Sequence, residues 1–84
     1  MMSNGIQNCK LNNMGFEEVG KALEEDLNLP QYKEAFLDEG IDGPVLVAMA
    51  LDAEMLDDCL ENELNIKSSL HRSKIKAWIT RNLA

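Results

Sequence analysis

Apolar residues recur at every fourth position in two separate segments of this 84-residue chain. The first series is Val19, Leu23 and Leu27, with acidic residues between them, and the second runs from Leu56 to Leu64. A spacing of four places side chains on one face of an α-helix, whereas a half-buried strand needs strict alternation. Because no segment alternates in that way, the pattern predicts an all-α fold.

Two prolines divide the middle of the chain into further helices, since the first position of a helix does not need a backbone N–H. Pro30 is expected to open a helix that ends near Glu39. Pro44 is expected to open a short, wholly apolar helix that ends at Leu51. The turn 40–43 between them contains two glycines, which favour a tight connection.

The second half of the chain predicts two more helices. Asp52 is a suitable N-cap for the helix that carries Leu56 and Leu64, and Ser68–Ser69 supplies a cap for the last and longest helix. Connections of roughly two to five residues force consecutive helices to pack against each other. We therefore expect a compact orthogonal bundle of five helices with a long C-terminal helix.

The N-terminal part of the chain differs in composition. The first sixteen residues contain four Asn and no continuous apolar stretch, so they do not resemble a secretion signal. We expect a flexible polar segment over 1–15 and a helical domain over 16–84. Cys9 and Cys59 are predicted to be free thiols of a protein in the reducing cytosol or nucleus. No apolar run is long enough to span a membrane.

Charge is strongly polarised along the chain, although the net charge is −7. All 15 acidic residues lie between Glu17 and Glu63, which gives the segment 1–63 a net charge of −12. The segment 64–84 has five basic residues and no acid, a net charge of +5. One interpretation is an acidic solvated surface with the usual cationic bias of a C-terminal helix, and the other is a molecule with complementary ends.

Motifs for catalysis or ion binding are incomplete. The segment 15–22 approaches a phosphate-binding loop, but Ala22 stands where magnesium needs a Ser or Thr hydroxyl. The segment 38–43 resembles the start of a calcium-binding loop, but two of the required ligands are missing. His71 is the only histidine, and no cysteine lies at metal-ligand spacing from it. We expect no catalytic activity, no metal and no cofactor.

Four short motifs follow one another between Glu17 and Leu83. They are Leu29–Phe36 with the pattern Leu-x-x-Tyr-x-x-x-Phe, Ile41–Gly43 with Ile-Asp-Gly, Leu64–Ile66 with Leu-Asn-Ile, and Leu70–Ile75 with Leu-His-Arg-x-x-Ile. This order resembles that of the sterile alpha motif (SAM) domain, a five-helix protein-interaction module. The third and fourth motifs stand where that family usually has Leu-Gly-Ile and Gly-His-Arg-x-x-Ile.

The chain also departs from the family pattern. Ala22 stands where many members have Trp, and Trp78 lies in the last helix, so the core packing is expected to be redistributed. The stretch from Gly43 to Leu64 is several residues longer than usual, which changes the third or fourth predicted helix or their junction.

The resemblance implies association with proteins through two different surfaces, a mid-loop face and an end-helix face. The partner would be a second copy or another SAM-like domain, and contacts between unlike faces could build an open head-to-tail polymer. The predicted mid-loop face consists of Val47, Met49, Leu51, Asp52, Glu54, Asp57, Asp58 and Glu61. The predicted end-helix face consists of Lys67, Leu70, Arg72, Lys74 and Lys76.

Some of the apolar residues Val45, Val47, Met49 and Leu51 are expected to stay exposed beside those acids and to form part of the interface. The alternative is that the extra residues before Leu64 cover this helix and complete the core.

Two other functions are compatible with the sequence. The basic residues at the start of the last helix could bind an RNA hairpin, although a net charge of −7 opposes contact with phosphates. The bundle could instead be a monomeric module that spaces a larger protein or binds an unrelated one.

Overall fold

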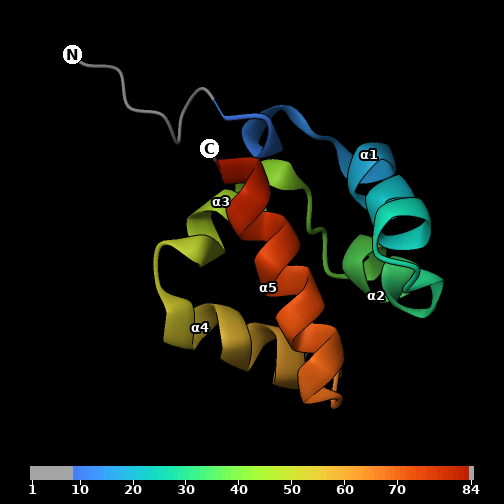
Figure 1. Cartoon of the computed structure of the whole chain (residues 1–84), viewed down its shortest axis with the longest axis vertical. Coiled ribbons are helices and arrows are strands. Elements are labelled where there is room, and N and C mark those ends of the chain that lie inside the picture. Colours follow the sequence, from blue (N-terminus) through green and yellow to red (C-terminus); the bar gives the residue numbers. More distant parts are fainter. Residues whose placement is uncertain (1–8, 84) are drawn as a thin grey trace.

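The computed structural model describes residues 9–83 and consists of helices joined by short connections (Figure 1). Within these residues there are five α-helices and no strand, which confirms the predicted fold class. The bounds are α1 Phe16–Lys21, α2 Lys33–Asp38, α3 Gly43–Ala50, α4 Ala53–Asp58 and α5 Ser69–Leu83. Short 3₁₀ turns cover Leu11–Asn13 and Pro30–Tyr32.

Two of the helices continue beyond their α-helical part as wider π-type turns. After α1 the chain keeps coiling through Ala22–Asp26, and after α4 it does so through Cys59–Glu63. The two predicted series of apolar residues, from Val19 to Leu27 and from Leu56 to Leu64, therefore each lie along one continuous coil.

Both coils end in the same way, with an asparagine in the left-handed conformation. Asn28 has a φ of 57° and Asn65 a φ of 58°. The N–H of the residue after each asparagine reaches back into the coil, from Leu29 to the Leu23 carbonyl at 2.7 Å and from Ile66 to Leu60 at 2.9 Å. Since asparagine is one of the few residues that adopt this conformation, the two asparagines act as helix terminators.

Side-chain caps begin three helices. Asp42 Oδ1 accepts from the N–H of Val45 at the start of α3, and Asp52 Oδ1 accepts from two N–H groups of α4. Ser68 Oγ accepts from the N–H of His71 at 3.2 Å in the first turn of α5. The predicted caps at Asp52 and Ser68 are thus confirmed.

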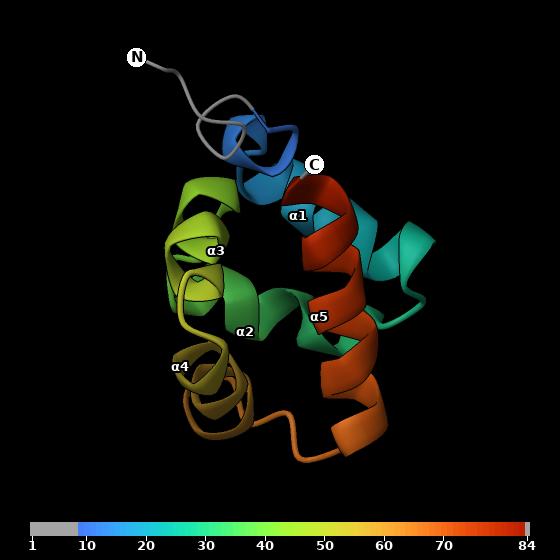
Figure 2. The same cartoon turned by 60° about the vertical axis from the view of Figure 1, so that its left-hand side comes forward.

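Helix α5 runs along the length of the molecule, and in the view of Figure 1 it has α3 and α4 on one side and α1 and α2 on the other. Figure 2 shows α3 and α4 in front of α1 and on the left of α5. It contributes Ile75, Trp78 and Ile79 to the core, and Ala22 is buried in the same cluster. The remaining buried side chains of this cluster are Cys9, Leu11, Val19, Leu23, Leu27, Leu29, Phe36, Ile41, Leu46, Val47, Met49, Leu56, Leu60, Leu64 and Ile66.

The lead segment before α1 packs on the bundle. Leu11 is fully buried and Cys9 nearly so, and the turn Leu11–Asn13 contacts α3 and α5. The N–H of Gly43 donates to the Met14 carbonyl at 2.8 Å. Residues 9–15, which were expected to be flexible, are packed on the bundle because the side chains of Cys9 and Leu11 are buried in the core. The rest of the segment predicted to be flexible, residues 1–8, lies outside the described part.

Candidate functional site

Helix α3 divides its apolar side chains between the core and the surface. Val47 and Met49 are buried, so these two residues of the predicted mid-loop face belong to the core. Leu51 at the end of α3 is 70% exposed, and Val45 is just exposed. The apolar side chains of this helix are therefore buried in part and exposed in part.

The junction between α3 and α4 carries an exposed apolar and acidic surface. Met55 on α4 is 45% exposed one turn after Leu51, and Asp52, Glu54 and Asp58 are exposed beside them. These five residues, Leu51, Asp52, Glu54, Met55 and Asp58, are called the junction patch below. The sequence alone does not indicate that Met55 is exposed, because it is one of several apolar residues in the predicted helix.

The junction patch does not include Asp57, which faces α5. Its Oδ1 accepts hydrogen bonds from Lys76 Nζ at 2.8 Å and from Arg72 Nε at 3.2 Å. The hydrogen bond from Lys76 is the largest cause that holds the pKa of the Asp57 carboxyl below its ordinary value; desolvation opposes it, and the hydrogen bond from Arg72 and the charges of both cations lower the pKa further. Asp57, Arg72 and Lys76 were assigned to two opposite faces, but they form one cluster that joins α4 to α5.

Two of the predicted end-helix cations have further contacts within the fold. Arg72 Nη1 donates to the carbonyl of Ile66 at 2.9 Å and to that of Lys67 at 3.2 Å, which fixes the connection before α5. Lys74 Nζ donates to the Leu27 carbonyl at 2.6 Å, at the end of the first coil. A cation there satisfies a carbonyl that the helix end leaves without an intrahelical partner.

Lys67 and Leu70 remain at the start of α5 without such contacts. Leu70 is 75% exposed and Lys67 is exposed on the preceding connection. We call these two residues the α5-start patch. The positive end of the α5 helix dipole lies at the same place.

Glu61 and Cys59 lie on the π-type turns after α4. Glu61 is half-buried there and is not part of the junction patch as defined above. Burial raises the pKa of the Cys59 thiol, and the carboxylates of Glu63 and Asp58 raise it further. Both Cys9 and Cys59 are free thiols, as predicted.

His71 has a partner inside the fold. Its Nδ1 lies 2.6 Å from the Tyr32 hydroxyl, and the two rings meet edge to face with centroids 5.5 Å apart. This contact joins α5 to the 3₁₀ turn before α2. Among residues 9–83 no group of His, Cys, Asp and Glu side chains is placed to hold a metal ion. No helix in that range is both long and apolar enough to cross a membrane.

A comparison with protein families agrees with this arrangement. The sequence profile of the SAM domain (sterile alpha motif) matches residues 11–81. The chain belongs to the SAM domain family. No curated protein and no solved structure matched the chain.

SAM domains are generally non-catalytic modules of protein–protein interaction. In this SAM domain, the position where the family usually has the glycine of Leu-Gly-Ile is Asn65, whose φ of 58° explains why a residue tolerant of the left-handed region stands there. The match also begins at Leu11, within the lead segment that packs on the core.

Proposed function

We propose that this SAM domain associates head to tail, with a second copy or with another SAM domain, through the junction patch of one molecule and the α5-start patch of the next. One observation carries the proposal. Leu70 and Leu51 have the largest exposed fractions among the large apolar side chains of residues 9–83. Each lies in a different patch, and the two patches have opposite charge.

The placement of the two patches supports this geometry. In both views the junction of α3 and α4 lies at the left of the molecule and the start of α5 lies at its lower end, separated by the coil of α4 and Cys59–Glu63 (Figures 1 and 2). A contact between unlike surfaces leaves one free copy of each at the ends of a dimer. Further molecules can then add, so the product is an open chain rather than a closed pair.

Apolar contact and charge have separate roles in the proposed interface. Leu51 and Met55 offer apolar area whose burial favours association, at about 25 cal/mol per Å². Asp52, Glu54 and Asp58 attract Lys67 and the positive end of the α5 dipole of the neighbour. These charges orient the encounter and exclude contacts between two copies of the same patch.

The test is the weight-average mass by sedimentation over a concentration series for wild type and Leu70→Glu. Leu70→Glu places an acid opposite the acidic junction patch and should keep the protein monomeric. Leu37→Glu is the matched control, because Leu37 is 61% exposed and lies outside both patches. Leu70→Glu associating as strongly as wild type would refute the proposal. A monomeric wild type would favour a monomeric module that binds an unrelated protein.

RNA binding, the alternative function, is less well supported. Of the four basic residues that it would use, Arg72, Lys74 and Lys76 each donate to an acceptor inside the fold. Only Lys67 has no such contact, and a single cation adds little to phosphate affinity.

A further inference from the structure

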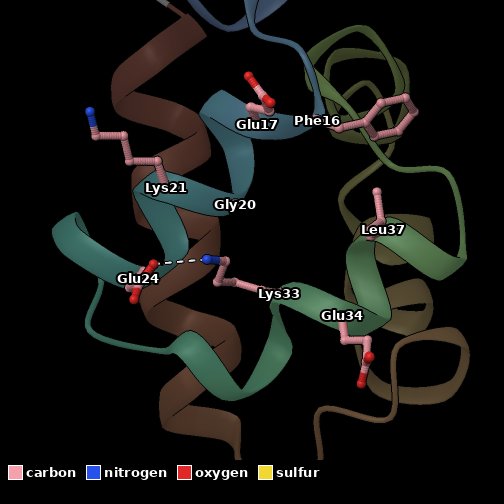
Figure 3. Close-up of a pocket in the computed structure, with 8 residues that line it drawn as sticks. All are labelled: Phe16, Glu17, Gly20, Lys21, Glu24, Lys33, Glu34 and Leu37. Atoms are coloured by element: carbon pink, nitrogen blue, oxygen red, sulfur yellow. Dashed lines mark hydrogen bonds and ion pairs between the residues drawn. The ribbon is translucent and has the colours of Figure 1, made fainter.

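A groove of about 450 Å³ lies between α1 and α2 (Figure 3), and none of the residues that line it belongs to either patch. Phe16 at the start of α1 and Leu37 near the end of α2 lie on the same side of this groove. The salt bridge between Glu24 and Lys33, at 2.8 Å, lies across it. The volume is within the range of about 300–1,000 Å³ that is typical of ligand sites.

Phe16 and Leu37 are large apolar side chains that the core does not use. Phe16 is 46% exposed and Leu37 is 61% exposed. Single exposed apolar residues are ordinary, but two that line one groove are typical of an interaction site. Burying them against a partner would remove both from water.

Gly20 helps to keep the groove open. It lies inside α1, where glycine costs about 1 kcal/mol relative to alanine. A Cβ at this position would meet only Lys33 Cε, at an ordinary contact distance of 3.5 Å. The fold therefore does not need a glycine here, and its effect is to leave space between α1 and α2.

The charge of the groove indicates the chemistry of its partner. Three carboxylates and two lysines line the groove, and the segment 16–40 that forms both walls has eight acidic residues against the same two lysines. Lys33 is paired with Glu24, and Lys21 lies on the lining beside the remaining carboxylates. The carboxylates of Glu17 and Glu34, on the two walls, make no hydrogen bond or ion pair with the described residues. An anionic ligand would be repelled, whereas a cationic one would be attracted.

We propose that the groove between α1 and α2 binds a basic amphipathic helix of a partner protein. The apolar face of that helix contacts Phe16 and Leu37, and its Lys and Arg side chains lie against Glu17 and Glu34. This is recognition of a helix in a groove, with apolar anchors at helical spacing. Since the groove is separate from the junction and α5-start patches, binding does not depend on head-to-tail association.

The probe is a fluorescent peptide of about 18 residues, long enough to form a helix, with leucines on one face and lysines elsewhere. Its binding is followed by anisotropy at low protein concentration and low salt. Wild type should bind, and a peptide with Glu in place of every Lys should not. Leu37→Arg should weaken binding at least tenfold, the usual effect of losing one interface anchor of about 1.4 kcal/mol. Gly20→Met, which fills the groove without changing charge, should also weaken it.

The matched control is Val45→Arg, which places the same new residue at an exposed apolar position outside the groove and outside both patches. It should bind the peptide like wild type. Equal binding by Leu37→Arg and wild type, equal loss in Val45→Arg, or no binding by wild type would each overturn the proposal. The head-to-tail proposal fails by a different result, a wild-type mass that does not rise with concentration.

Discussion

The carboxylate of Asp57 on α4 lies 2.8 Å from the ammonium of Lys76 on α5, so an acid and a base that were expected on opposite faces are paired. Arg72 shares the same oxygen. This contact joins the α4 coil to α5, which contributes Ile75, Trp78 and Ile79 to the core. It also explains why charge reversal at these residues would disturb the fold as well as any interface.

Asp57→Asn should lower the thermal unfolding midpoint at neutral pH. The pKa of Asp57 in the folded protein lies below the ordinary 3.8, so its stabilising effect is complete at about pH 6 and is lost as the pH falls below 3.8 through the folded pKa. The gap in midpoint between wild type and variant should therefore close in acid. A gap that stays constant down to the lowest pH at which both proteins fold would contradict this role.

Gly43 and Gly20 form a natural pair for testing close packing. A Cβ at Gly43 would lie 1.8 Å from the Leu11 carbonyl oxygen and 2.7 Å from that of Met14, so Gly43→Ala must push the lead segment away. We expect a loss of about 1–3 kcal/mol, the usual cost of inserting a methyl group where the backbone must shift to make room. Urea denaturation measures the change.

Gly20→Ala should instead raise stability by about 0.5–1 kcal/mol, since the helix gains propensity and the added methyl group has room. Equal changes in the free energy of unfolding for Gly43→Ala and Gly20→Ala would show that the lead segment does not pack closely against Gly43.

Asn65, at the end of the α4 coil, should be replaceable without loss of stability by glycine but not by a β-branched residue. Asn65→Gly should be neutral within a few tenths of a kcal/mol, whereas Asn65→Val should cost about 1–2 kcal/mol, because a β-branched residue resists a φ of 58°. Denaturation midpoints of the two variants test this. A well-tolerated valine would mean that the chain leaves the coil in another conformation.

Self-association should weaken with salt without disappearing. At about 0.5 M salt the Debye length is only about 4 Å, so attraction between the two patches is screened while the contacts of Leu51 and Leu70 are not. Light scattering at low and high salt should show a lower mass at high salt at each concentration. A mass that rises with salt would mean that apolar contact alone drives association.

The sequence was sufficient for the helices and for most of the core. Apolar residues at every fourth position, together with Pro30 and the Asp52 cap, locate the helices through local chemistry alone. The sequence did not predict which side chains of α3 are buried. This helix is short and wholly apolar, so no periodicity distinguishes buried Val47 from exposed Leu51 at its end.

The candidate surfaces were harder to predict for a tertiary reason. Whether Asp57 is free depends on the packing of α4 against α5, which brings together residues 15 and 19 positions apart. The lead segment was misjudged because its composition is polar on average, whereas its packing depends on Cys9 and Leu11 alone.

The most direct test of head-to-tail association uses two variants that each lose one patch. Leu51→Lys disables the junction patch and Leu70→Glu the α5-start patch, and both positions are exposed enough to leave the core intact. Each variant alone should be monomeric by light scattering, and an equimolar mixture should reach the mass of a dimer and no more, because each molecule keeps one working patch. A mixture that stays monomeric while wild type associates would contradict the proposed pairing of these two surfaces.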